Sequence, residues 1–585
     1  MDDEAHSIDA SMDDLSDWFP VTMDELSDSS TSTNDSNNPT YSQERVIKHI
    51  TKLIFSAGLS LNFGSFSGIV NLFQTLNPRF KKIKRKTVLK QARQDYSKMK
   101  KQLHSDFASL SNKIALTCDV WRNEYCQDYV RITTHWIDSD WCMHRRIITF
   151  KMFDLPFSSD PIMVTVYNGA WGIKDKIISI TVDDLCDNDE VFMSISDKTP
   201  PILDGKLFRV RCASRALGLC ITAGISAVCQ HITNIRNGFH KPGNHKDSYK
   251  LLCEKHGLRP RYGISDDGIS WDSTWEMLRR SLPYKDVLEE FFGVHWPDEE
   301  IITKLDWEVA TVFTRFLDVF YEAVDFVSTN YYPASSGILL RLVNIAKLFA
   351  EYRGSVVFGE KVAVMEEKFL EHYEKIPDLY CLAAIMDPRI KLSGCECLME
   401  SFYQCTDSKK INFEQERMNV SDMLREMYNI YASMFHQTQP PKKSSSCSGT
   451  SGFAWSLIGQ KKQKTEGLDF DELEFYLKSP HRFVDIEGFD ILKWWCNQES
   501  VYPVLASMAR DLLTTPVSTL AADSAFDINP EKNIRDKSYY MEGHRTMKLY
   551  ACMKDWYNAE GRTQGKREPY YEDERWYDLE DEMFM

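Results

Sequence analysis

Between residues 111 and 215 the apolar residues change from helical spacing to the two-residue spacing of β-strands. Apolar and polar positions alternate through the second and third runs of this segment, as in strands with two distinct faces. The loops that join the first three runs are short, so these runs are predicted to be antiparallel neighbours. Because the flanking chain has helical spacing, the sequence predicts an α/β fold. The predicted strands are Ile114–Asp119, Val130–Trp136, Ile147–Met152, Lys176–Asp183 and Lys206–Arg211.

With 585 residues the chain is too long for one compact core, so several domains are expected. A helical segment is predicted from about Gln43 to Leu76, a basic helix from there to Leu110, another helix near Pro161–Trp171, and a compact helical unit from Phe489 to Trp556. The predicted segments are a disordered acidic tail (1–42), a helical basic segment (43–110), the sheet (111–215), a helical insertion (216–436), a flexible linker (437–467), a C-terminal helical region (468–557) and a second acidic tail (558–585).

The formal net charge of -16 conceals a strongly basic run. Residues 1–40 carry eleven acids and no Lys or Arg, whereas residues 79–101 carry eleven bases and only one acid. Such a run is often a solvated helix face, but its density favours contact with a phosphate backbone and also suits nuclear import. The candidate DNA contacts are Lys81, Lys82, Lys84, Arg85 and Lys86.

Fifteen cysteines without a regular framework, and no secretory signal, predict free thiols in a reducing compartment. No stretch approaches the roughly 18 uncharged apolar residues of a membrane helix, so no membrane partner is expected. Six potential zinc ligands lie close together in the sequence, but their irregular spacing predicts no zinc site. They are Cys229, His231, His240, His245, Cys253 and His256.

Several short motifs follow one another in the order found in the hAT superfamily of DNA transposases, and the resemblance extends from about residue 43 to residue 557. It implies an RNase H-like catalytic core interrupted by a large helical insertion, followed by a C-terminal dimerisation region. It also implies DNA and a second copy of the chain as partners, nuclear localisation and no small-molecule substrate. The motifs are Leu116–Trp121, Thr181–Asp184 with Asn188–Asp189, Phe208–Arg215, Trp271–Leu278, Ala384–Leu392 and Asp490–Asp511.

Two of these motifs contain the strand-end carboxylates Asp119 and Asp183. Aspartate often ends a strand beside a turn for structural reasons alone. In-line attack on a phosphodiester, however, uses two divalent ions about 3.5–4 Å apart that carboxylates hold. The resemblance implies that both residues are catalytic ligands of Mg²⁺ or Mn²⁺, and that Asp523 is the third.

The sequence departs from the family at several positions that bear on catalysis. Asp523 replaces a glutamate, and a displacement on the order of 1 Å at a reacting centre costs about a hundredfold in rate. Arg215 replaces a histidine and cannot accept a proton, while Ser270 replaces an arginine. Arg215 is also a candidate DNA contact. No BED-type zinc finger precedes the matched region. Strand cleavage is therefore expected to be feeble or absent.

Aromatic residues supply two further sets of candidate functional residues. Trp121 and Trp271 occupy positions that the resemblance assigns to base stacking, although packing in the interior is the alternative. The candidate dimerisation residues are Trp494, Trp495, Tyr502 and Leu505, which together exceed what one small helical unit buries.

Three functions stay open from the sequence. The favoured one is a nuclear, transposase-derived DNA-binding protein that is catalytically impaired and forms a homodimer or a larger assembly. The second is an active cut-and-paste transposase that uses Asp119, Asp183 and Asp523. The third is a protein-interaction scaffold whose acidic tails recruit partners.

Overall fold

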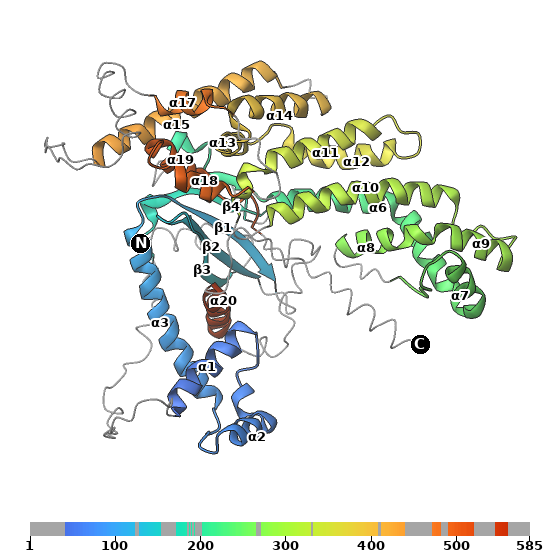
Figure 1. The fold of residues 1–585 in the computed structure, drawn as a ribbon, viewed down its shortest axis with the longest axis horizontal. Coiled ribbons are helices and arrows are strands. Elements are labelled where there is room, and N and C mark those ends of the chain that lie inside the picture. Colours follow the sequence, from blue (N-terminus) through green and yellow to red (C-terminus); the bar gives the residue numbers. More distant parts are fainter. Residues whose placement is uncertain are drawn as a thin grey trace, which may run out of the picture.

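The computed structural model shows a mixed sheet between two groups of helices (Figure 1). Helices α1–α3 and α20 lie on one side of the sheet, and helices α6–α19 lie on the other. The predicted α/β class is therefore confirmed. The structure describes residues 41–122, 128–153, 171–183, 186–187, 189, 192–193, 202–264, 271–328, 332–406, 411–438, 471–480, 489–519 and 544–559.

The five strands of the sheet are arranged in the order β3-β2-β1-β4-β5. The first three strands pair antiparallel, as predicted, and β4 and β5 continue the sheet in parallel to β1. The last strand is shorter than predicted, and the helix predicted at Pro161–Trp171 falls almost wholly outside the described residues. The strands are β1 (Ile114–Arg122), β2 (Asp128–Ile137), β3 (Met143–Phe153), β4 (Ile177–Val182) and β5 (Arg209–Arg211).

The N-terminal segment forms three α-helices, α1 (Gln43–Ser56), α2 (Ser67–Leu76) and α3 (Arg85–Ser109). The helical segment predicted from Gln43 to Leu76 divides into α1 and α2, because Gly58, with φ of 67°, follows the end of α1. The N–H of Leu59 then donates to the carbonyl of Ile54 at 2.8 Å, which closes the helix end. The basic run is also helical only from Arg85 onward.

The long segment after the sheet is helical, as predicted. Its helices are α6 (Ala213–His240), α7 (Lys246–Lys255), α8 (Trp271–Ser281), α9 (Lys285–His295), α10 (Lys304–Val327), α11 (Ile338–Tyr352), α12 (Gly359–Tyr373), α13 (Asp378–Ile385), α14 (Lys391–Cys405) and α15 (Phe413–Thr438). The C-terminal region adds α17 (Glu472–Lys478), α18 (Ile491–Gln498), α19 (Pro503–Thr514) and α20 (His544–Asn558). Short 3₁₀ turns are Phe63–Ser65, Lys174–Lys176, Ile202–Gly205, Lys241–Asn244, Leu282–Tyr284 and Ala334–Ser336.

Helix α6, with the turn that follows it, is long and apolar enough to cross a membrane by length and composition, contrary to the expectation that no stretch would be. It packs against α10 and α12, and one side of it is lined by buried residues. The core helix of a globular protein has the same composition, so packing within this fold accounts for the apolar character of α6.

Two hydrophobic cores organise the described residues. The sheet core joins one face of the sheet to α1, α3 and α20. The insertion core joins α6–α19 to residues of the opposite face, such as Ala115. The prediction of one compact helical unit from Phe489 to Trp556 is therefore wrong, because α18 and α19 belong to the insertion core and α20 belongs to the sheet core.

Helix α20 is fixed to the sheet through the backbone of Ile147 in β3. The N–H of Ile147 donates to Oδ2 of Asp555 at 2.8 Å, and Nε1 of Trp556 donates to the carbonyl of Ile147 at 2.9 Å. The pairing of β2 with β3 shifts register at this point, as in a β-bulge. The Trp556 ring also stacks on Tyr96 of α3 with centroids 4.9 Å apart, so α20 ties β3 to the N-terminal helices.

Asp511 of α19 links the C-terminal region to the start of β1. Its Oδ1 accepts the N–H of Lys113 at 2.8 Å, and its Oδ2 accepts the hydroxyl of Tyr431 at 2.6 Å. The carboxyl group is buried, and burial raises the pKa of Asp511 to about 6.

We expect Asp511→Asn to remove a pH-dependent part of the stability. Because the pKa is higher in the folded state than the ordinary value, the stabilisation is complete below about pH 4 and is lost as the pH rises through about 6. The shift corresponds to about 3 kcal/mol in free energy of unfolding. About 2 kcal/mol of it is lost between pH 4.5 and pH 7.5, where denaturant unfolding measures it. The exposed Glu360→Gln is the control and should follow the wild type, and a wild-type pH dependence in Asp511→Asn contradicts the assignment.

Candidate functional site

The structure brings Asp119 and Asp183 together on neighbouring parallel strands. Cys118 of β1 pairs with Val182 of β4, and each aspartate is the next residue along its strand direction. The N–H of Val120 donates to Oδ2 of Asp183 at 3.0 Å. Since Thr117 and Ala115 precede Asp119 by two and four positions, Asp119 points to the sheet face that carries the insertion core.

Asp119 is not an open carboxylate, because Arg131 of β2 binds both of its oxygens. Arg131 stands directly opposite Asp119 in the antiparallel register. Its Nε donates to Oδ1 at 3.1 Å, and its second guanidinium nitrogen lies 2.8 Å from Oδ2. Only 6% of the Asp119 side chain and 21% of the Arg131 side chain are exposed, so the pair is shielded from water.

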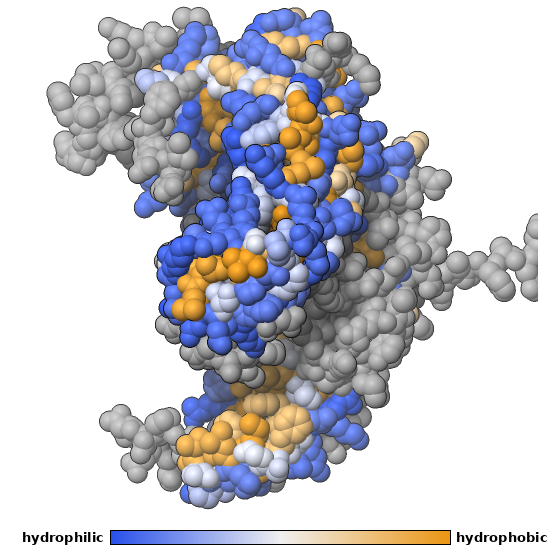
Figure 2. Space-filling model, turned by 90° about the vertical axis from the view of Figure 1, so that its right-hand side faces the viewer, coloured by the Kyte–Doolittle hydropathy of each residue, from blue (hydrophilic) through white to orange (hydrophobic). Residues whose placement is uncertain are grey.

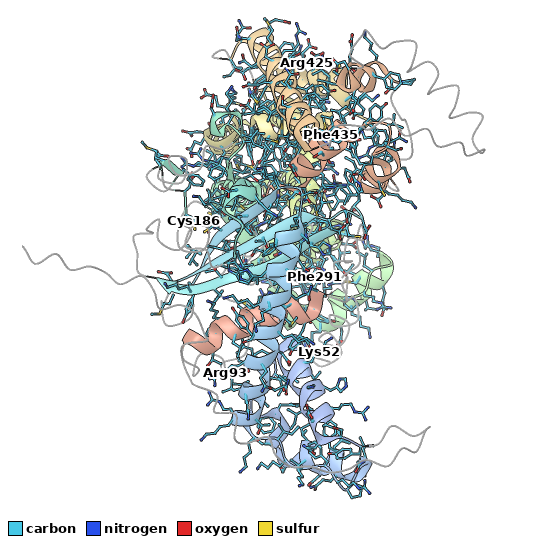
Figure 3. All side chains as sticks on the ribbon, turned by 90° about the vertical axis from the view of Figure 1, so that its left-hand side faces the viewer. Lys52, Arg93, Cys186, Phe291, Arg425 and Phe435 are labelled. Atoms are coloured by element: carbon cyan, nitrogen blue, oxygen red, sulfur yellow. The ribbon has the colours of Figure 1, made fainter. Side chains whose placement is uncertain are left out.

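Asp183 is half-buried beside two thiols. Its Oδ1 accepts the N–H of Cys186 at 2.9 Å, and the Sγ atoms of Cys118 and Cys186 lie 3.5 Å apart. Figure 3 shows Cys186 beside the sheet. Burial is the largest influence on Asp183 and, with the charge of Asp119, raises its pKa to about 6, although N–H donors oppose the change.

The third predicted carboxylate, Asp523, lies outside the described residues, but the chain that leads to it can be followed as far as Thr519. The hydroxyl of Thr181 donates to the carbonyl of Pro516 at 2.6 Å, which sets this segment along β4. The N–H of Thr519 donates to Sγ of Cys212 at 3.3 Å, and the N–H of Cys212 donates to the carbonyl of Val182 at 2.9 Å. The segment therefore returns to the end of β4.

The described residues do not fit a two-metal site. Each oxygen of Asp119 and Asp183 already accepts an N–H donor, and one of the donors is a guanidinium cation. Across the part of the chain that the structure describes, no three His, Cys, Asp or Glu residues are grouped so as to hold a metal ion.

Neither Trp271 nor Arg215 is fully exposed to solvent. Only 1% of Trp271 is exposed, and its ring packs edge-on against Tyr321, as in the alternative of interior packing. Base stacking by Trp271 stays a prediction. Arg215 is half-buried in the first turn of α6. Trp121 pairs with Tyr129 across β1 and β2 through the backbone, and its side chain lies outside the described residues.

The predicted dimerisation residues lie in the core of a single chain. Trp495 and Leu505 are fully buried, only 5% of Tyr502 is exposed, and Trp494 is half-buried. The expectation that they exceed what their own helices bury overlooked the insertion, whose helices α13 and α15 pack against α19. These side chains therefore do not form an exposed apolar surface.

The basic residues are where the sequence predicts them, on the surface. Lys81, Lys82, Lys84, Arg85 and Lys86 are all exposed. Phe80, just before these cations, and Ile83, among them, are buried in the sheet core. The N–H of Ile83 donates to the carbonyl of Gly64 at 3.1 Å. The cations thus stand on a fixed backbone. Figure 3 shows Arg93 farther along α3, on the helices below the sheet.

Sequence reasoning missed two features. Arg131 carried a signal, since it is a lone charge between apolar residues of a predicted strand, at even spacing from His135 on the same face. The other is an apolar surface on α2, a helix without buried residues. Phe66, Leu72 and Leu76 are 49%, 55% and 74% exposed there, and apolar surface is visible at the lower end of the molecule in Figure 2.

Three sequence profiles match the chain in order. They are the ZBED1 RNase-like domain over residues 117–206, the hAT-like transposase, RNase-H fold over residues 340–431, and the hAT family C-terminal dimerisation region over residues 472–557. The first range begins within β1 and includes β2, β3 and β4. The second extends from α11 into α15. These matches confirm the expected fold class, an RNase-H fold with a hAT dimerisation region.

Relatives match most of the chain. The chain is 25% identical over 560 residues to the zinc finger BED domain-containing protein RICESLEEPER 1 of Oryza sativa subsp. japonica, covering 89% of this chain and 75% of that protein. It is 25% identical over 524 residues to a putative AC transposase of Zea mays, covering 84% and 62%. It is 24% identical over 529 residues to DAYSLEEPER of Arabidopsis thaliana, covering 88% and 74%.

Proposed function

Because this chain belongs to the hAT transposase-like family, we propose that it is a nuclear DNA-binding protein that forms a homodimer and cuts DNA feebly or not at all. A putative transposase is among its relatives, and transposases act on DNA. The observation that carries the DNA-binding part is the basic run of residues 79–101.

The basic run has the properties of a phosphate-binding surface. Five exposed cations lie within six residues, and the buried Phe80 and Ile83 fix the backbone that presents them. On α3 the buried residues Val88, Ala92 and Tyr96 face the sheet core, so the bases of this helix lie mostly toward solvent. Each phosphate that a cation neutralises releases a counterion, which makes the affinity strongly dependent on salt. The same run supports the nuclear assignment.

Replacing Lys81, Lys82, Lys84, Arg85 and Lys86 with Gln is expected to weaken binding to all duplex sequences. The slope of log K against log salt should fall by roughly 0.9 for each lost phosphate contact. Titrations of a labelled duplex at several salt concentrations measure both quantities. The control exchanges five exposed lysines of other helices for Gln, with the same change in net charge: Lys250, Lys304, Lys347, Lys478 and Lys493. Equal losses of DNA affinity in the two variants contradict the proposal. If the wild type binds no DNA at all, the protein-interaction scaffold is the function that remains.

Impaired catalysis is supported by three positions. Arg131 binds both oxygens of Asp119, Arg215 stands in the motif that has histidine in the family, and Asp523 replaces a glutamate. The alternative is an active cut-and-paste transposase using Mg²⁺ or Mn²⁺ at Asp119, Asp183 and Asp523. The same duplexes, incubated with either ion, are expected to stay intact. Cleavage that disappears in Asp183→Ala establishes the alternative.

The homodimer is supported by the match of residues 472–557 to the hAT C-terminal dimerisation region. Trp495, Tyr502 and Leu505 are buried within one chain and Trp494 is half-buried, so this part of the proposal rests on the region as a whole rather than on these four side chains.

A further inference from the structure

The ion pair between Arg131 and Asp119 is built into the sheet. The two residues are directly opposite each other in the β1–β2 register, and the guanidinium donates to both carboxylate oxygens. A bidentate pair of this kind combines two charge-assisted hydrogen bonds with a fixed geometry. Because both side chains start from paired strands, their separation is set by the backbone.

Arg131 keeps its charge in this environment. An arginine guanidinium stays protonated in proteins, and this one lies at hydrogen-bond distance from both oxygens of Asp119. Asp183 and Asp555 of α20 also interact with its charge. Arg131 is therefore a permanent cation among three carboxylates.

A permanent cation at this position opposes a divalent metal ion. A metal ion bound by Asp119 would have to displace the guanidinium or sit a few ångströms from it. At the effective dielectric of a protein, a unit charge at such a distance repels a divalent ion by more than the free energy of a tenfold change in affinity. Removing the metal ion from such a site normally leaves carboxylates that repel one another, and here Arg131 compensates that repulsion.

We propose that Arg131 is a built-in cation of the Asp119–Asp183 pair and takes the place that a divalent metal ion takes in a two-metal nuclease. The proposal rests on the functional assignment of these two aspartates made above. It explains how the neighbouring carboxylates of buried Asp119 and half-buried Asp183 are held in the folded chain without a metal ion. It also makes one arginine, in addition to the departures at residues 215 and 523, a cause of weak catalysis.

The test measures binding of Mn²⁺ alone to the full chain, without DNA, by electron paramagnetic resonance of the free ion. Wild type is expected to bind weakly. Arg131→Met, which keeps a long unbranched side chain but removes the charge, is expected to bind more than about tenfold more tightly. Arg131→Lys keeps the charge and is expected to stay within about threefold of wild type, since the charge is what repels the ion. The double variant Arg131→Met, Asp119→Asn should lose the gain.

Melting curves give a second readout of the same proposal. Arg131→Met is expected to melt below wild type without metal and to recover with Mn²⁺, whereas the melting temperature of wild type should hardly respond. Equal Mn²⁺ affinities of wild type and Arg131→Met, or a gain that survives Asp119→Asn, overturn the proposal. DNA binding through the basic run is measured separately in EDTA. If that binding is absent while Arg131→Met gains Mn²⁺, the proposed function fails and this inference stands.

Discussion

Replacing Trp556 with alanine is expected to destabilise the sheet core by about 3–5 kcal/mol, the range for buried Trp to Ala. Only 2% of Trp556 is exposed. The substitution removes the stacking on Tyr96 and the hydrogen bond to the carbonyl of Ile147, and so loosens α20 from both α3 and β3. Hydrogen exchange resolved by segment should show faster exchange in α1 and α3, with α10–α12 unchanged.

The conservative control for this position is Trp556→Phe, which keeps an aromatic ring beside Tyr96 but loses the donor to Ile147. Its cost should be smaller, about 1–3 kcal/mol for the unsatisfied carbonyl. Faster exchange throughout the chain in Trp556→Ala would show that the two cores unfold as one unit. Unchanged exchange in α1 and α3 would show that α20 does not support them.

Trp495→Ala is expected to cost about 3–5 kcal/mol in free energy of unfolding while the oligomeric state persists. Trp495 is fully buried, and its Nε1 donates to the carbonyl of Met386 at 2.9 Å. Its ring contacts Tyr476 and Trp494 in the same core. Denaturant unfolding measures the stability. Sedimentation over a range of protein concentrations, under conditions in which both proteins are folded, measures the association.

The matched control is Phe475→Ala, an aromatic residue of the same region that is 50% exposed. Its effect on stability should be about 0.5 kcal/mol, as for most surface substitutions. If Trp495→Ala instead yields a monomer of unchanged stability, Trp495 contacts the second copy as the sequence first suggested.

The parts of the fold that the sequence predicts well are those with a local pattern. Period-two alternation located β2 and β3, and the strand-end aspartates placed Asp119 and Asp183 on the same edge. The spacing of apolar residues is less informative about where a helix ends. After α1, for example, apolar residues continue past Gly58, although the helix ends before it.

The features that escaped prediction depend on contacts between distant residues. The spacing in the C-terminal region shows that Trp495 is on an apolar face, but only the fold shows that Met386 receives its N–H. The same spacing gives no reason to separate α20 from α19 into different cores. Alternation placed Arg131 on a face of β2, whereas its pairing with Asp119 needed the register of two strands.

The position of α20 in the sheet core has a consequence for the order in which the chain folds as it is made. Ser109, the end of α3, and His544, the start of α20, are 435 residues apart. At roughly 5–20 residues per second, a ribosome needs about 20–90 s to travel from one to the other. Throughout that interval the first helices expose the surface that Trp556 and Tyr550 later cover. Helices α1 and α3 are thus completed by a helix made 435 residues after them, and a nascent-chain chaperone has a site to occupy in between.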